Sequence, residues 1–261
     1  MTFGWYGIRL ELPEDYAPTA LSGGRRDGYV RLASGGPVGL QVRWRDTKNP
    51  LGLDGRVETY LLDLKKQAKK KRLPFESDFH VVPHGVEYRY RGAQSGAGTL
   101  RYDEGGERVV FLEAVGPSAG AVDKTRRSIG TPIFAPKNAP ELWAILGLRV
   151  SIPPGYEIAG RKFVSGRTQL DLRRKAKTVT AERWGFAEQL ASKHGLAAGA
   201  AAALGFRKPV VVEGERRVAL EERTLVGTLR ALAVLDQDEN QIRTVMTRRG
   251  RTGPEWEWLD V

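Results

Sequence analysis

Apolar and polar positions alternate over residues 7–12, and the same pattern returns 140 residues later. The segment Gly7–Tyr16 (GIRLELPEDY) recurs as Gly147–Tyr156 (GLRVSIPPGY). In each segment three apolar residues alternate with polar ones, and a proline and a tyrosine follow. Strict alternation is typical of a strand with one buried face, and proline ends such a strand. We therefore expect a strand and then a turn at the start of each half of the chain.

The likeness between the two halves extends beyond this strand. At the spacing of 140, Arg43–Trp44 recurs as Arg183–Trp184, and we interpret both tryptophans as core residues. The first half then contains 11 extra residues, after which the spacing becomes 129. At that spacing the tetrapeptide GTLR stands at both Gly98–Arg101 and Gly227–Arg230. Because one loop-sized insertion reconciles all these matches, the sequence predicts an internal duplication.

Each half predicts a helix between two groups of strands. In Val57–Arg72 the apolar residues recur at i, i+3, i+4, i+7 and i+11, which is one face of an α-helix. The strands expected in the first half are Gly7–Leu12, Gly28–Ala33, Val38–Arg45, His80–Val82, Val86–Gly92, Gly98–Asp103 and Arg108–Val115. The strands expected after the second helix are Val210–Val212, Arg216–Leu225, Thr228–Leu235 and Gln241–Arg248.

Strands that follow one another without intervening helices pair antiparallel. We therefore expect an α+β fold made of two tandem repeats, each an antiparallel sheet with a helix packed on one face. Residues 1–139 form the first α+β repeat, with a short terminal helix at Gly120–Ile129 and a proline-rich linker at Thr131–Pro140. Residues 140–261 form the second repeat. Its last residues, with Trp256 and Trp258 between glutamates, are interpreted as an edge strand, the alternative being a tail that docks elsewhere.

This order of elements resembles the PsbP/Mog-type fold. The likeness is carried by Leu12–Tyr16 (LPEDY) at the end of the first strand, by the helix Val57–Arg72, and by the terminal helix that ends in Arg127–Ile129. It covers most of the first half and, without the terminal helix, most of the second. The resemblance implies a non-catalytic accessory protein, and a tandem duplication is a departure from that family.

Composition narrows the class of protein. The 261 residues are 41% hydrophobic with a mean hydropathy of −0.40, and no apolar run approaches the ~18 residues that span a bilayer. The first residues lack the pattern of a signal peptide, so we expect a soluble, cytoplasmic protein. The chain has no cysteine, which excludes disulfides and thiolate chemistry. Two methionines and abundant arginine are typical of heat-adapted proteins.

The chain is strongly basic, with a formal charge of +11 and a pI of about 9.9. Residues 1–139 hold 22 basic and 16 acidic side chains, and residues 140–261 hold 20 and 15, so both halves carry the excess. Such a charge attracts nucleic acid, anionic membrane surfaces or acidic proteins. The alternative is an arginine-rich surface that serves solubility.

Catalytic and metal-binding patterns are weak. His80 and His84 flank a proline in an extended segment, which keeps them apart, and no further ligands stand nearby. The segment Gly155–Lys162 has the glycine spacing of a phosphate loop but lacks its lysine and hydroxyl positions. No serine nucleophile motif occurs. We therefore expect no catalytic residues, no metal and no cofactor, and a protein that is not an enzyme.

The basic clusters are the best candidates for a binding site. Six positive charges fall within eight residues at the end of the first helix: Lys65, Lys66, Lys69, Lys70, Lys71 and Arg72. Cations favour a helix C-terminus, but that effect explains two or three of them. The equivalent segment of the second half, residues 194–201, has almost none. The run therefore indicates an anion-binding task of one half only.

Two further sets complete the candidate surface. The second half has its own run at Arg173, Arg174 and Lys175. The strand residues Tyr88, Arg89, Tyr90 and Arg91 alternate rings and cations, which suits base stacking with phosphate contacts if the tyrosines face solvent. In the alternative arrangement the tyrosines face the core and the arginines face water.

These patterns favour a non-enzymatic binding or adaptor protein whose partner is nucleic acid or another polyanion, contacted through its phosphates. Two alternatives stay open. One is a protein–protein adaptor of PsbP/Mog type with an acidic protein partner. The other is an enzyme or small-ligand binder that uses a cleft between the two repeats.

Overall fold

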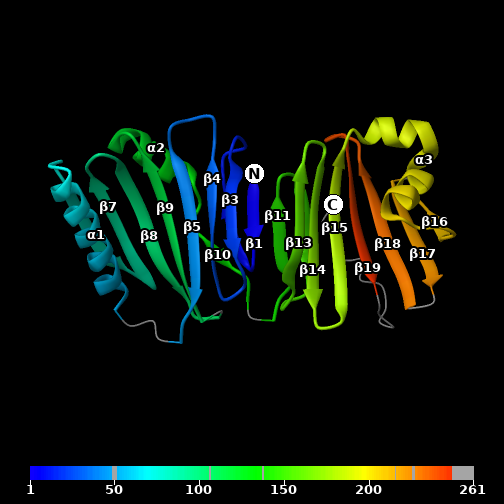
Figure 1. Ribbon diagram of the computed structural model, residues 1–261, viewed down its shortest axis with the longest axis horizontal. Helices are drawn as coiled ribbons and strands as arrows, with labels where there is room; N and C mark the ends of the chain where they lie inside the picture. Colours follow the sequence, from blue (N-terminus) through cyan, green and yellow to red (C-terminus); the bar gives the residue numbers. More distant parts are fainter. Residues whose placement is uncertain (49–51, 106, 137, 215, 225–226, 249–261) are drawn as a thin grey trace. The chain divides into compact units, whose positions relative to one another are not determined.

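The computed structural model describes residues 1–48, 52–105, 107–136, 138–214, 216–224 and 227–248 (Figure 1). The described residues are mostly in strands, with few in helices, so the expected α+β class is wrong. The expectation missed several strands, among them β1 (Thr2–Trp5), β3 (Ala17–Gly23) and β11 (Glu141–Ile145). The chain divides into two compact units, Met1–Lys137 and Asn138–Val261, which are described one at a time.

Unit 1 is built on an antiparallel seven-stranded sheet with the order β3-β4-β5-β9-β8-β7-β6. Its remaining strands are β4 (Asp27–Ala33), β5 (Gly39–Asp46), β6 (Glu76–Val82), β7 (Gly85–Arg91), β8 (Ser95–Asp103) and β9 (Arg108–Gly116). A hairpin of β1 and β2 (Ile8–Glu11), extended by β10 (Ile133–Phe134), contributes a second layer. The Tyr6 ring of this hairpin lies 5.9 Å from the Trp44 ring of the sheet, which places the hairpin on the Trp44 face.

Two helices cover parts of this sheet (Figure 1). The helix α1 (Leu53–Lys70) packs on β6, β7 and β8, and its buried side chains Val57 and Leu61 join the cluster that holds Val86 and Leu100. Helix α2 (Ala119–Ser128) packs on β8 and β9. It lies on the other face, where Gly116 leaves room for Val122.

Unit 2 repeats the strand order of unit 1, as β13-β14-β15-β19-β18-β17-β16. The strands of this sheet are β13 (Glu157–Val164), β14 (Arg167–Arg174), β15 (Lys177–Gly185), β16 (Val210–Glu213), β17 (Arg217–Thr224), β18 (Gly227–Asp236) and β19 (Gln241–Arg248). A separate hairpin is formed by β11 and β12 (Leu148–Ile152). Helix α3 (Ala187–Leu204) packs on β17, β18 and β19 and is broken at Gly195, which has φ 74° and ψ 157°.

Local backbone geometry recurs in the two units at a spacing of 140. The β1–β2 turn has φ of 50° at Tyr6 and 78° at Gly7, and the β11–β12 turn has the same values at Leu146 and Gly147. Two successive left-handed residues make the type I′ turn that suits the twist of a hairpin. The repeated glycine of the sequence is therefore the glycine that this turn needs.

A β-bulge also recurs. The pairing of β3 with β4 shifts between Pro18 and Ala20, and that of β13 with β14 shifts between Ile158 and Gly160. The extra residue bends the strand and increases its twist at that point. Both bulges lie in the first strand of a seven-stranded sheet.

The two tryptophans matched by sequence are both buried, but they face opposite sides of their sheets. Trp44 lies on the same face as Val30, because Val30 pairs directly with Val42. In unit 2 the residue opposite Leu170 is Ala181, an odd number of residues from Trp184. The registers differ by one residue, because Leu32 pairs with Leu40 whereas the matching Leu172 pairs with Val179, and such a slip moves a side chain to the other face.

Other expectations have mixed outcomes. The expected helix at Gly120–Ile129 is confirmed as α2, which begins after Ser118, whose Oγ accepts a 3.4 Å hydrogen bond from the amide of Ala121. The expected linker is in part a strand, since β10 pairs with β2. Trp256 and Trp258 lie outside the described residues. Among the helices of the described residues, none is long and apolar enough to cross a membrane.

Candidate anion-binding cleft

The six cations expected to bind phosphate are all exposed at the C-terminal end of α1. The 100° step of an α-helix distributes them around its solvent side. Lys66 Nζ lies 3.1 Å from Asp63 Oδ1, and both side chains are mostly exposed, so this ion pair is worth little. Arg72 follows the helix with φ 54°, in the left-handed region. The structure thus leaves this group of charges accessible to a ligand.

The second basic run lies in unit 2, at the turn between β14 and β15. Arg173, Arg174 and Lys175 are exposed, and Lys175 has φ 54°. Arg173 Nε donates a 3.0 Å hydrogen bond to the carbonyl of Lys175, which holds its side chain along the turn. This run is smaller than the one on α1.

The tyrosines proposed for base stacking are buried, so that assignment of Tyr88 and Tyr90 is wrong. Tyr88 is 3% exposed and Tyr90 is 7% exposed, and both face α1. Arg89 and Arg91, on the other face of β7, are exposed, and Arg89 lies 3.8 Å from Asp78. The alternation therefore follows the ordinary division between core and solvent.

Two glycines of β8 explain how these rings fit. Gly96 lies opposite Tyr90 and Gly98 lies opposite Tyr88 in the pairing of β7 with β8. A Cβ atom at either glycine would collide with the facing tyrosine ring or its hydroxyl. The rings lie across β8, and Tyr88 thereby reaches β9, where its hydroxyl donates a 3.0 Å hydrogen bond to Glu113 Oε1.

Glu113 is a fully buried carboxyl that sequence reasoning missed. The Tyr60 hydroxyl donates a 2.8 Å bond to its Oε1, and Gln41 Nε2 donates a 2.6 Å bond to its Oε2. Burial raises the pKa of Glu113, while these hydrogen bonds, that of Tyr88 and the charge of Arg43 oppose the rise. Burial and the facing carboxylate raise the pKa of Tyr60 as well. The available signal was one carboxylate inside the apolar run Val109–Val115.

A cleft of about 700 Å³ opens beside this network, between α1 and the strands β4, β5 and β9. Four exposed arginines line it, together with three rings that are at least partly exposed: Arg31, Arg43, Arg45, Arg56, Tyr29, Tyr60 and Phe111. Asp27 is the one carboxylate among the described lining residues. The lining is therefore strongly positive.

The register of the sheet places these side chains in rows. One row crosses three strands as Tyr29, Arg43 and Phe111, and the next as Arg31, Gln41 and Glu113. Arg43 contacts a residue of each row: its guanidinium donates a 2.9 Å hydrogen bond to Gln41 Oε1 and lies 5.9 Å from the Phe111 ring centre. Gln41 in turn donates to Glu113, so the buried carboxyl holds the floor of the cleft in place.

The cleft arginines differ from the structural arginines of this protein. Arg108 is buried and donates to Asp46 Oδ1 at 3.0 Å and to the carbonyls of Tyr6 and Arg25 at 2.7 Å. Within the described part of the chain, no carboxylate forms an ion pair with Arg31, Arg45 or Arg56. Asp27 and Arg45 are partners in the strand register, but their side chains do not form an ion pair. Unpaired arginines grouped in a hollow are suited to bind an anion.

Unit 2 carries the opposite charge at the matching positions. Arg31 corresponds to Asp171 at the spacing of 140. The register differs by one residue, so the residue opposite Tyr29 is Arg43, whereas the residue opposite the matching Gln169 is Glu182. The cavity on this face of unit 2 is about 450 Å³, and Arg167 there is paired with Glu182 at 2.9 Å. The fold therefore does not require arginines on this face, and the positive cleft is a property of unit 1.

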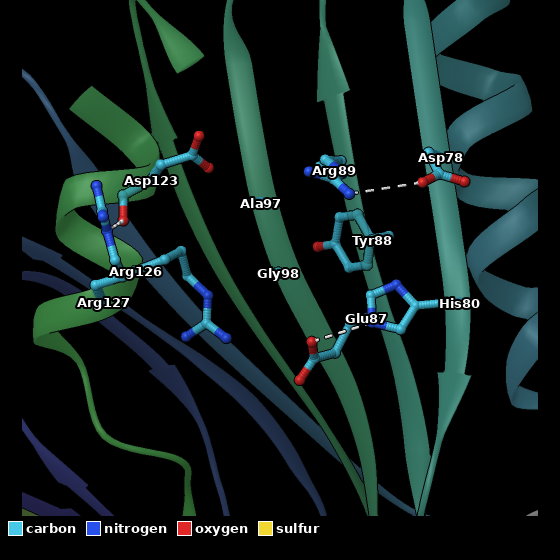
Figure 2. A pocket seen from close by; sticks show the side chains of 10 residues that line it. All are labelled: Asp78, His80, Glu87, Tyr88, Arg89, Ala97, Gly98, Asp123, Arg126 and Arg127. Atoms are coloured by element: carbon cyan, nitrogen blue, oxygen red, sulfur yellow. Dashed lines mark hydrogen bonds and ion pairs between the residues drawn. The ribbon is translucent and has the colours of Figure 1, made fainter. Parts of the chain in front are cut away.

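A second hollow lies on the other face of the unit 1 sheet, between α2 and β6, β7 and β8 (Figure 2). It measures about 480 Å³, and its three arginines are balanced by three carboxylates. Figure 2 shows Arg126 directed toward Glu87, which itself lies 3.4 Å from His80 Nε2. Burial lowers the pKa of Arg126. Its balanced charge makes this hollow a poorer anion site than the cleft beside α1.

The described ranges hold no candidate metal centre, because no three His, Cys, Asp or Glu side chains in them are grouped so that they could hold an ion. His80 and His84 each face a different glutamate, with His84 Nδ1 at 3.4 Å from Glu104 Oε1. Both histidines are mostly exposed.

Comparison with known proteins gives little. No protein-family model matches the chain, and no curated protein matches it. Among solved structures, the chain is similar to the immunity protein TplEi of the T6SS from Pseudomonas aeruginosa, complexed with the "L" peptide. The alignment covers 97% of this chain and 88% of that protein, with 11% sequence identity and a TM-score of 0.34. A likeness this low carries no argument about fold or function. The PsbP/Mog-type resemblance stays a prediction.

Proposed function

We propose that this protein is a non-enzymatic binding protein that contacts nucleic acid through its phosphates, with the cations of residues 65–72 as its main contact surface. The exposure of all six side chains supports the proposal. Lys66 alone among them forms an ion pair with a described carboxylate, and that pair is weak. Lysine and arginine side chains that neutralise phosphates release condensed counterions, which supplies affinity that does not depend on base sequence.

The fold does not need these cations. Helix α3 has 18 residues, as α1 does, and it has no basic residue in its last turn. The exposed positions of α1 accept any good helix former, and the dipole of a helix favours only the cations in its last turn. A binding role accounts for the charges that the dipole leaves unexplained.

The smaller run Arg173–Lys175 is the second surface of the proposal, because it is exposed at a turn. The net charge of +11 attracts a polyanion over the whole surface and raises the rate of encounter. The proposal places the protein in the cytoplasm, which cell fractionation checks. An acidic protein partner would contact the same cations, so the test includes polyglutamate as an acidic polypeptide.

The test is a salt titration of binding to labelled single-stranded and double-stranded DNA and RNA. The variant replaces all six α1 cations by glutamine: Lys65→Gln, Lys66→Gln, Lys69→Gln, Lys70→Gln, Lys71→Gln and Arg72→Gln. We expect wild-type affinity to fall steeply as salt rises. In the variant the slope of log K against log[salt] becomes shallower by roughly 0.9 for each duplex phosphate that is no longer neutralised.

A matched control removes six exposed cations of unit 2 that belong to neither cluster: Lys162→Gln, Arg207→Gln, Lys208→Gln, Arg216→Gln, Arg217→Gln and Arg223→Gln. If the control weakens binding as much as the α1 variant, general charge is responsible and the site is wrong. If no nucleic acid binds at low salt while polyglutamate does, the partner is an acidic protein and the proposal fails.

A further inference from the structure

We infer that the arginine-lined cleft of unit 1 binds one or two unpaired nucleotides, with its arginines on the phosphates and the Tyr29 ring against a base. The inference rests on the proposed function and narrows it to single-stranded nucleic acid. Nothing in the sequence alone pointed to this cleft, because its lining comes from β4, β5, β9 and α1.

Size and shape favour a short stretch of single strand. The cleft volume of about 700 Å³ lies within the range of pockets that enclose a small organic ligand. In a duplex the faces of the bases are stacked on one another and cannot enter such a hollow. Splayed bases of a single strand stack on aromatic side chains and on arginine planes, and the cleft offers both.

Tyr29 is the ring most available for stacking. It is 38% exposed and lies next to Arg43 in the register. The Phe111 ring lies under the Arg43 guanidinium, and the Tyr60 hydroxyl is bound to Glu113. A base that enters the cleft therefore meets Tyr29 first, with a cation beside it.

The arginines supply the phosphate contacts. Arg31, Arg45 and Arg56 come from three elements and form no ion pair with a described carboxylate, so an anion does not have to displace such a carboxylate. Arg43 is held by Gln41 and therefore loses little freedom when a ligand binds. The acidic residues at the matching positions of unit 2 show that this charge is specific to unit 1.

The cleft and the α1 cations are separate along the helix. Arg56 and Lys65, the nearest of these cations, are nine residues apart on α1, which at 1.5 Å per residue is about 14 Å. A four-residue oligothymidylate can therefore contact both, so its binding is also measured on the variant that lacks the six cations of residues 65–72, where the cleft remains. This measurement separates a failure of the inference from a failure of the proposed function.

The experiment measures fluorescence anisotropy of the full chain with a labelled four-residue oligothymidylate and with a labelled hairpin duplex at matched phosphate concentration, and polyglutamate is a competitor without rings. The variants are Tyr29→Ala and Arg31→Gln/Arg45→Gln/Arg56→Gln. The control triple Arg207→Gln/Arg216→Gln/Arg223→Gln removes the same charge from exposed positions of unit 2. Thermal unfolding of each variant verifies that it folds.

We expect the duplex to bind through residues 65–72 with an affinity that does not depend on Tyr29, and the oligothymidylate to depend on it. Loss of one stacked base in Tyr29→Ala weakens binding of the oligothymidylate by about 5- to 100-fold without changing the salt slope. The cleft triple makes the slope shallower, and the control triple leaves affinity within about twofold.

Three results would overturn the inference. One is an unchanged affinity for the oligothymidylate in Tyr29→Ala. Another is polyglutamate that displaces the oligothymidylate as well as unlabelled oligothymidylate does, because then charge alone is recognised. The third is an oligothymidylate that does not bind at low salt. If long duplex DNA still binds through residues 65–72 in any of these cases, the proposed function stands and only the cleft assignment is wrong.

Discussion

The hydroxyl of Tyr60 on α1 donates a 2.8 Å hydrogen bond to Glu113 Oε1 on β9, so the helix is joined to the middle of the sheet through a buried carboxyl. Tyr88 and Gln41 bind the same carboxyl, and the floor of the cleft is therefore one hydrogen-bonded network. Buried networks of this kind are stable when every member has a partner, and each member becomes costly when a partner is removed.

We expect Tyr60→Phe to lower the free energy of unfolding by about 1.5–3 kcal/mol, because a hydrogen bond to a buried carboxyl is removed while the ring stays in place. Urea unfolding followed by circular dichroism measures the change. Tyr29→Phe is the matched control, since Tyr29 is partly exposed, and we expect a change within about 0.5 kcal/mol. Equal effects of the two substitutions would show that the Tyr60 bond has no special weight.

Glu113 makes stability depend on pH. Burial raises its pKa, so the folded state binds the proton more tightly than the unfolded state. The stability contributed by such a group is complete below its unfolded pKa and is lost as pH rises through its folded pKa. We therefore expect the free energy of unfolding of the wild type, relative to that of Glu113→Gln, to grow as pH is lowered from about 7.5 to about 5.

Urea titrations of both proteins across that range measure the difference directly. The variant is the reference, because it lacks this one titrating group and keeps the others. A difference that shrinks as pH falls would mean that hydrogen bonding lowers the pKa of Glu113 by more than burial raises it.

Gly98 is required by the ring that lies over it. We expect Gly98→Ala to destabilise the protein by about 1–3 kcal/mol, because a Cβ atom there collides with the Tyr88 hydroxyl and the carbonyl of Leu112. The control is Gly120→Ala in α2, where a Cβ atom meets nothing within 4 Å. That substitution is expected to be neutral or to stabilise by up to about 1 kcal/mol, because alanine favours helix. Thermal unfolding compares the two.

Arg108 is expected to be the most costly arginine to remove. Arg108→Met removes three hydrogen bonds donated by a buried guanidinium, to Asp46 and to the carbonyls of Tyr6 and Arg25, which lowers the free energy of unfolding by about 3–5 kcal/mol. Lys66→Met breaks an exposed ion pair and is expected to cost at most about 1 kcal/mol. Urea unfolding at low and high salt checks both, and a small loss for Arg108→Met would contradict the structural role.

Local signals in the sequence predicted local structure well. The alternation over Gly7–Leu12 predicted a strand, which the structure places at Ile8–Glu11, although Gly7 itself belongs to the preceding turn. The apolar spacing of Val57–Arg72 predicted a helix, which the structure places at Leu53–Lys70. The fold class was wrong because strands such as β3, which is rich in small residues and contains Pro18, lack the apolar alternation of a typical strand.

Features set by strand pairing could not be predicted. Arg31 and Gln41 became neighbours only through the register of β4 with β5, and the helix α1 brought Arg56 to the same cleft. Trp44 and Trp184 are both buried, as expected, but their opposite facing could not be predicted, because it follows from a one-residue difference in strand register. Candidate sites that depend on such pairings need the structure.

The bulges in β3 and β13 have a consequence for solubility at high concentration. Each lies in a strand at the end of its sheet, where a regular row of unpaired amide and carbonyl groups would accept a strand from another chain. The extra residue interrupts that row and twists the strand away from a regular partner. Both units thus carry, at the same position, a feature that hinders self-association into extended intermolecular sheets.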